Sequence, residues 1–438
     1  MAKKSICWRD PQGRSYFPKN ANDTKHAPLA LIKTYIEYLD FDNGKVVINN
    51  PFEIKKFETA LQASFALNES GASIDYIDAW SFLNKAICNK IQSSGQKDKI
   101  KLEEIIFDAD KLAKSYLRKK TKNYSLVTSL SIDKFPSNSI SILGCSITAL
   151  KSRYDYYSLP KSNTVSIPNN LINHIEATKY TPIRIKTSGR SVSEAAQKAF
   201  GALDLLRGIW NFLITFRNWS VNYGVAVPKP LGAIACSPIH TLHYPSGKMV
   251  NDSYWYAPSY MDDITLYKPK SGWKRIERDR HYIAGKITYS PYKSDLVYVF
   301  RRYCDALDAT NTNVAFLHLW GVLEKITDTV GAHYDTTIKR ASWIFSKKDQ
   351  PLTREILQAL RIKRNQVVHA GHDTHDQILY LIKYFIDPHL RLLINNIFEV
   401  RSLSEYGKFL ESSTSYGVLK SQRKQVELAM KIRRSWDR

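Results

Sequence analysis

The first 125 residues carry apolar positions at spacings of three and four, the pattern that one buried face of an α-helix produces. Glycine-containing segments near residues 44 and 71 interrupt this pattern, and Pro51 suits the first position of a helix. The pattern predicts helices over residues 29–39, 51–67, 73–91 and 101–120. We therefore expect residues 1–123 to form a mainly helical N-terminal region.

From residue 124 the pattern becomes that of β-strands. Residues 125–132 and 139–143 are rich in β-branched and apolar side chains and flank a short segment that contains a proline, which predicts a β-hairpin. Residues 181–186 alternate in polarity and predict another strand. Ser191 and Glu194 have the spacing of a capping box, which predicts a helix running to about residue 216.

Residues 224–292 are rich in proline, glycine, tyrosine and serine, and they show little periodicity. They predict loops with short strands over residues 263–267 and 282–289. Residues 124–292 are thus expected to be a mixed α/β region with a loop-rich second half.

Helical periodicity returns at residue 293 and continues to the end of the chain. It predicts helices over residues 294–309, 312–330, 351–369, 374–398 and 417–434. Residues 293–438 are therefore predicted to be a helical bundle that ends in a basic helix. The expected fold class is α+β with several domains.

The composition agrees with a folded chain, because 43% of the 438 residues are hydrophobic and 24% are charged. No run approaches the roughly 18 apolar residues of a membrane span, and the first residues lack a secretory signal pattern. The five cysteines are widely separated and include no C-x-x-C pair. This cysteine usage disfavours a disulfide scaffold or zinc ribbon and predicts a cytoplasmic protein. The lack of an apolar span predicts that the protein has no membrane partner.

The net charge of +23 favours a polyanionic partner. Nearly all of the excess lies in residues 111–122, 268–286, 339–364 and 419–438, which could bind phosphates with release of counterions. In the second window, aromatic residues alternate with cations and predict a loop that binds RNA by stacking and by phosphate contact. Its candidate RNA-binding residues are Lys274, Arg275, Arg278 and Arg280. The alternatives are that the charges cover solvated helix faces and that the rings are buried.

The most informative segment for chemistry is residues 359–371. Asn365 and His369 are four residues apart and share one helix face, and Arg361 lies four residues earlier. Arg364 lies about 140° from His369 on an ideal helix. Arg364 therefore joins the same site only if the helix ends or distorts, or if a second copy of the chain supplies the partner. Gly371 predicts the helix stop.

Two other interpretations of this segment stay open. A histidine in the last turn of a helix often interacts only with carbonyl groups and the helix dipole. A transition metal is a second interpretation, because histidines recur at steps of three beside two aspartates; the residues are His369, His372, His375, Asp373 and Asp376. Gly371 interrupts this run, so a metal is disfavoured and no cofactor is predicted. Cys236, His240 and His243 form a looser pattern of the same kind.

The string from Arg364 to His369, followed by Gly371, resembles the R-x(4 to 6)-H signature of HEPN domains. Residues 316–324, which contain Trp320 and Glu324, resemble the preceding helix of ApeA-like HEPN proteins. The resemblance covers roughly residues 300–400, and nothing comparable identifies residues 1–290.

The resemblance implies a metal-independent endoribonuclease that acts as a homodimer with a composite active site. His369 would take a proton from a ribose 2′-hydroxyl or donate one to the leaving oxygen. Arg364 would bind the scissile phosphate, Asn365 would orient the phosphate or the imidazole, and Glu324 would steady Arg364 or His369. The products would be a 2′,3′-cyclic phosphate and a 5′-hydroxyl. Arg361 and Lys363 are further candidates for RNA contact.

The resemblance also implies a biological role as a prokaryotic toxin or an antiphage effector of abortive infection. Its partners would be RNA, with tRNA as one candidate, and an antitoxin or a phage trigger protein. The alternative function is that of a noncatalytic RNA-binding or scaffold protein that dimerises through its helical bundle.

Overall fold

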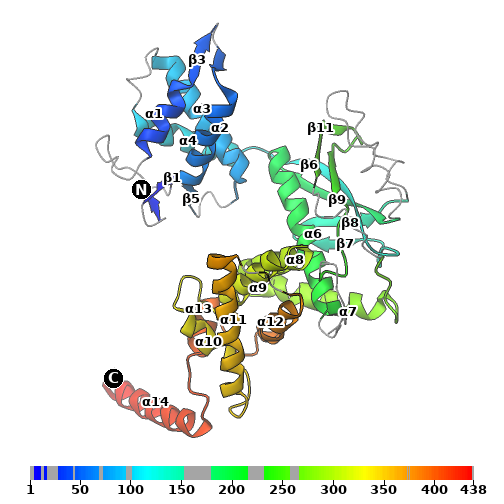
Figure 1. The fold of residues 1–438 in the computed structure, drawn as a ribbon, viewed down its shortest axis with the longest axis vertical. Coiled ribbons are helices and arrows are strands. Elements are labelled where there is room, and N and C mark those ends of the chain that lie inside the picture. Colours follow the sequence, from blue (N-terminus) through cyan, green and yellow to red (C-terminus); the bar gives the residue numbers. More distant parts are fainter. Residues whose placement is uncertain are drawn as a thin grey trace. The chain divides into compact units, whose positions relative to one another are not determined.

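The computed structural model describes residues 4–10, 14–16, 28–42, 45–68, 73–94, 101–151, 179–215, 231–256, 266–371, 373 and 375–436 (Figure 1). Two compact units are distinguished. The first comprises Met1–Leu126, Lys186–Ala199 and Leu242–Val250, and the second comprises Val127–Ile185, Phe200–Thr241 and Asn251–Arg438.

The N-terminal region is mainly helical, as predicted. Its helices are α1 (Leu29–Glu37), α2 (Pro51–Ser64), α3 (Tyr76–Ser94) and α4 (Leu102–Leu117). They pack around a core that includes Ile36, Trp80 and Ile106. The predicted helix over residues 51–67 is too long, because its last residues form a strand, β5 (Phe65–Leu67), which pairs with β1 (Ile6–Arg9).

The other small strands of this region are β2 (Ser15–Tyr16), β3 (Leu39–Asp42) and β4 (Lys45–Ile48). They form the order β2-β1-β5 and the separate pair β3-β4. Periodicity missed these strands because each is only two to four residues long.

A six-stranded sheet has the order β11-β10-β6-β9-β8-β7. Its strands are β6 (Lys122–Leu130), β7 (Ile140–Ile142), β8 (Cys145–Ala149), β9 (Thr181–Gly189), β10 (Ile239–His243) and β11 (Met249–Tyr256). The predicted hairpin between residues 125–132 and 139–143 is wrong, because β9 and β8 separate β6 from β7. The hairpin joins β7 to β8 instead, through a tight turn in which Gly144 adopts a φ of 75°.

Helix α6 (Val192–Thr215) begins at the predicted capping box, where the Ser191 hydroxyl accepts a hydrogen bond from the Glu194 amide at 3.0 Å. The prediction of loop and strand within residues 224–292 is wrong for residues 273–289, because they form a helix, α7 (Trp273–Tyr289). Its buried residues Trp273, Ile283 and Ile287 share one face, and the cations between them conceal this spacing in the sequence. The predicted strand over residues 263–267 lies mostly outside the described residues.

The last third is helical, as predicted, and the chain as a whole is of mixed α and β structure. Its helices are α8 (Lys293–Asp308), α9 (Thr312–Ile326), α10 (Tyr334–Ser342), α11 (Gln350–Ala370), α12 (Gln377–Asn395), α13 (Leu403–Phe409) and α14 (Tyr416–Trp436). The short helices α10 and α13 were not predicted. None of the helices in the described ranges has both the length and the apolar character that crossing a bilayer requires.

Buried His389 connects three helices of this bundle. On α12 it accepts a hydrogen bond from the Tyr406 hydroxyl of α13 through Nδ1 at 2.7 Å and donates one from Nε2 to the Ala341 carbonyl of α10 at 3.1 Å. Burial lowers the pKa of His389 to about 4, so the ring is neutral at pH 7. These hydrogen bonds fix α10, which carries part of the candidate site.

The depressed pKa of His389 predicts a loss of stability in mild acid. Below pH 6.5, the usual pKa of histidine, His389 is protonated in the unfolded chain but stays neutral in the folded chain. The free energy of unfolding therefore falls as the pH falls toward 4. Between pH 7 and pH 5 this group should cost about 2 kcal/mol. Urea unfolding at both pH values measures it. His389→Gln should remove this part of the pH dependence, and an unchanged pH dependence in that variant would contradict the assignment.

Candidate functional site

Helix α11 presents the predicted motif on an unbroken helix. It continues to Ala370 and ends at Gly371, whose φ of 63° is the left-handed conformation that the predicted stop requires. One face of α11 carries polar side chains at steps of four, three, four and four residues. We call this set the polar stripe; its members are Arg354, Gln358, Arg361, Asn365 and His369.

The ring of Tyr334, at the start of α10, contacts two arginines of α11. The guanidinium of Arg361 lies 5.3 Å from the ring centroid and that of Arg364 lies 5.2 Å from it. Arg361 also forms an ion pair with Asp335 at 2.8 Å. These contacts attract both cations to α10, because an aromatic face stabilises a nearby positive charge.

Arg364 is partly buried and retains unused hydrogen-bonding capacity. Its Nη1 donates to the Asn365 side-chain oxygen at 3.3 Å. Its Nε atom is buried and has no hydrogen-bond partner in the part of the chain that the structure describes. A buried donor without a partner carries a free-energy penalty, which an acidic or phosphate ligand would relieve.

His369 is exposed in the last turn of α11, and no hydrogen bond or ion pair within the described ranges engages its ring. Because α11 neither ends nor distorts before this residue, ideal helix geometry directs Arg364 and His369 about 140° apart. Arg361 and Asn365 share the face of His369, whereas Arg364 does not. A single copy of α11 therefore does not direct the Arg364 and His369 side chains to one point.

Glu324 is connected to the motif through Trp320 and Tyr334. Its carboxylate accepts a hydrogen bond from the Trp320 indole at 2.7 Å, and the Trp320 ring contacts Tyr334 edge-on at 6.2 Å. Within the described ranges, Glu324 forms no ion pair with Arg364 or His369. It therefore orients Trp320 against the tyrosine that the arginines contact.

The other predicted RNA-binding residues lie in varied surroundings. Lys363 donates to the Asp373 carbonyl at 2.5 Å, so it contacts the segment after α11. On α7, Arg275 and Arg278 are exposed and pair with Asp279, and Lys274 is exposed. Arg280 is 8% exposed and pairs with Glu277, so its guanidinium is not presented to a nucleic acid.

The aromatic residues of this window do not form the predicted stacking loop. Trp273 is 5% exposed and donates from its indole to Asp133 at 3.1 Å. Tyr282 is 52% exposed and donates to Asn395. Burial as local core is therefore the correct interpretation for Trp273.

No group of three or more histidine, cysteine or carboxylate side chains that could bind a metal occurs among the described residues. His372, which belonged to one metal pattern, lies outside them. In the other pattern, His240 bonds to the Thr128 hydroxyl at 2.8 Å and His243 to the Gly247 carbonyl at 3.0 Å. No disulfide joins the five cysteines.

Tyr334 and the N-terminal half of the polar stripe were not among the site residues predicted from the sequence. Arg354 and Gln358 continue the spacing of Arg361, Asn365 and His369, so extending the pattern by two turns would have found them. Tyr334 had no such signal, because it lies on a separate short helix.

Comparison of the chain with family models, with curated proteins and with solved structures gave no match.

The contact between Tyr334 and the two arginines predicts a stability effect that depends on the ring. Tyr334→Leu should lower the free energy of unfolding by about 1–2 kcal/mol, because it removes two cation–π contacts. Tyr334→Phe keeps the ring and should retain most of the stability. Urea unfolding of both variants measures the effect. An equal loss in the two variants would show that the hydroxyl, not the ring, is responsible.

Proposed function

We propose that this protein is a metal-independent endoribonuclease of the HEPN type, with His369 as its acid–base group and Arg364 as its phosphate-binding group. The observation that carries the proposal is the exposed His369 at the end of a polar stripe, close in sequence to Arg364, whose buried Nε has no partner among the described residues. The strong net positive charge supports RNA as the substrate.

The polar stripe suits phosphodiester cleavage by the ribose 2′-hydroxyl. His369 accepts the proton of the hydroxyl or donates one to the leaving 5′-oxygen, because imidazole changes charge near neutral pH. Asn365, one turn earlier, orients the imidazole or a phosphate oxygen. Arg361 adds a permanent positive charge on the same face. Its ion pair with Asp335 at 2.8 Å weakens the attraction of this charge for a phosphate.

Arg364 enters the proposed site from a second copy of the chain. The unbroken helix excludes a local distortion that would bring Arg364 to the His369 of its own copy. In a twofold dimer with two facing α11 helices, Arg364 of one copy lies near His369 of the other. Its planar fork then binds two oxygens of the scissile phosphate and stabilises the charge that develops on them.

An exposed apolar side chain on α11 supports such a dimer. Val368 is 44% exposed, and on an ideal helix it points about 40° from Arg364 and about 100° from His369, between the two. Apolar side chains that are exposed on a helix face are typical of protein interfaces. A second copy that packs against Val368 therefore lies within reach of both Arg364 and His369.

The biological role that follows is a toxin or an antiphage effector that halts growth by cutting cellular or viral RNA in the cytoplasm. Such an enzyme needs restraint, which an antitoxin or a phage trigger protein would regulate. The competing proposal, a noncatalytic RNA-binding scaffold, uses the same dimer and the same basic surface but requires no role for His369.

Cleavage of RNA in the presence of EDTA tests the enzyme directly. The purified protein should cut total RNA and tRNA, and His369→Ala and Arg364→Ala should each lower the rate at least about 100-fold, the scale of a lost general acid or base. RNA binding should change little in His369→Ala. His375→Ala, an exposed histidine outside the motif, is the control and should cut normally. Equal cutting by all four proteins would reject the assignment, and RNA binding without cutting would favour the scaffold.

The dimer is tested by a substitution that does not repel RNA. Val368→Arg places a cation on the proposed twofold interface, so the variant should sediment as a monomer and should lose cleavage. Val330→Arg, at a residue that is 68% exposed and lies outside α11, should remain dimeric. A wild-type protein that sediments as a monomer at cleavage-competent concentrations would contradict the composite site.

A further inference from the structure

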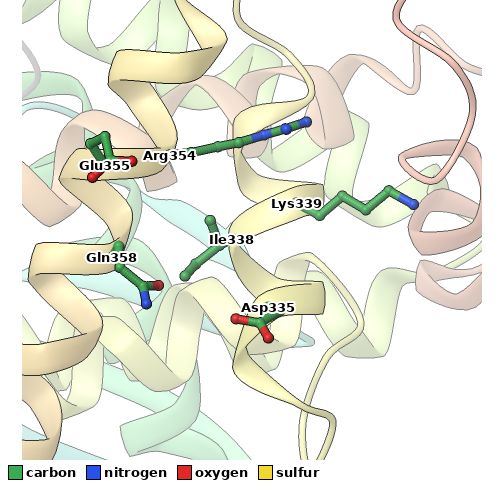
Figure 2. Close-up of a pocket in the computed structure, with 6 residues that line it drawn as sticks. All are labelled: Asp335, Ile338, Lys339, Arg354, Glu355 and Gln358. Atoms are coloured by element: carbon green, nitrogen blue, oxygen red, sulfur yellow. The ribbon is translucent and has the colours of Figure 1, made fainter.

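A pocket of about 470 Å³ lies between α10 and α11, beside the ion pair of Asp335 with Arg361 (Figure 2). Its lining residues are Asp335, Ile338, Lys339, Arg354, Glu355 and Gln358. Ile338 is 7% exposed and forms an apolar floor. Figure 2 shows the side chains of Arg354 and Lys339 extending in the same direction from two different helices. The pocket therefore combines an apolar surface with two cations and several hydrogen-bonding groups.

Several polar atoms of this pocket have unused capacity. The Gln358 oxygen accepts from Arg361 at 3.5 Å, which leaves its amide nitrogen as a donor. Arg354 donates from Nε to the Ser342 hydroxyl at 3.3 Å, which leaves its two terminal nitrogens. Within the described ranges, no hydrogen bond or ion pair engages the carboxylate of Glu355 or the ammonium group of Lys339.

The pocket lies on the polar stripe, at the opposite end from His369. Fifteen residues separate Arg354 from His369, which corresponds to about 22 Å along a helix that rises 1.5 Å per residue. A single strand of RNA that is cut at His369 and follows the stripe therefore reaches the pocket a few nucleotides away. The volume falls within the range of about 300–1,000 Å³ that small-molecule sites occupy.

We propose that this pocket binds one nucleotide of the RNA substrate and selects guanine. This inference rests on the proposed ribonuclease function. Guanine presents two adjacent N–H donors and one carbonyl oxygen on its Watson–Crick edge. The Glu355 carboxylate accepts from the two donors, and the Gln358 amide donates to the carbonyl. Glu355 and Gln358 are three residues apart, so neighbouring positions on α11 read the two ends of this edge.

The remaining groups bind the rest of the nucleotide. Ile338 contacts the face of the base, and Arg354 and Lys339 bind the adjacent phosphates. Adenine places the lone pair of its N1 atom where guanine has an N–H donor. Glu355 then faces a lone pair at N1 and a C–H group at C2, so adenine offers neither of the hydrogen bonds that guanine donates to the carboxylate. The pocket therefore prefers guanine to adenine although the two purines have nearly the same size.

The first test maps the sites at which the full-length protein cuts a single-stranded RNA of random sequence. Guanine should be enriched at one fixed position a few nucleotides from the cut. Glu355→Gln should lower that enrichment about tenfold, the discrimination that a bidentate contact with a base provides, without stopping cleavage. The matched control is Glu399→Gln, an exposed glutamate outside α11, which should leave the enrichment unchanged. Cleavage with no guanine preference, or with one that Glu355→Gln does not alter, would overturn the proposal.

A binding measurement separates this proposal from the ribonuclease proposal. Fluorescence anisotropy compares labelled 2′-O-methyl oligoadenylates that differ by one internal guanine; the methyl group blocks the attacking hydroxyl. The guanine-containing strand should bind about tenfold more tightly, and Glu355→Gln should abolish the difference. This result without any RNA cleavage would reject the ribonuclease and keep the guanine site. Cleavage with equal binding of the two strands would reject the guanine site alone.

Discussion

The contact of the Tyr334 ring with two arginines of α11 is the interaction on which the candidate site depends. The ring lies 5.3 Å from the Arg361 guanidinium and 5.2 Å from that of Arg364, and Asp335, the next residue, forms an ion pair with Arg361. Trp320 and Glu324 support the ring from α9, and His389 supports α10 through the Ala341 carbonyl. The position of Arg364, the proposed phosphate-binding group, is therefore set by packing among helices, and the motif sequence alone does not fix it.

The same packing places Arg364 and His369, the two residues of the motif, in different surroundings. Arg364 is drawn toward α10 and partly buried, whereas His369 is exposed beside the end of the helix at Gly371. The unbroken α11 prevents these two groups from meeting within one copy of the chain. The proposed composite site between two copies satisfies this constraint, and in that proposal the polar stripe is the path of the RNA from the cut phosphate to the pocket between α10 and α11.

Local rules predicted most of the helices because each depends on contacts within a few residues. The spacing of apolar residues predicted α11, and Gly371 predicted its end. Long-range features were not predictable in this way: the sheet order places β9 and β8 between β6 and β7, and pairing of distant strands leaves no mark on either strand. Helix α7 was missed because its dense cations conceal the apolar face. In the site, the shared face of Arg361, Asn365 and His369 was predicted, but the contact with Tyr334 and the indirect position of Glu324 were not.

In the proposed mechanism, the ribose 2′-hydroxyl is the nucleophile and His369 moves its proton. The most direct measurement is the chemical identity of the cut ends on an RNA with one preferred cleavage site, made also with a single 2′-deoxyribose on the 5′ side of that site. Attack by the 2′-hydroxyl should leave a 2′,3′-cyclic phosphate and a 5′-hydroxyl on the normal RNA, and it should leave that site uncut in the substituted RNA. A 3′-hydroxyl with a 5′-phosphate, or cleavage at the deoxyribose, would contradict it.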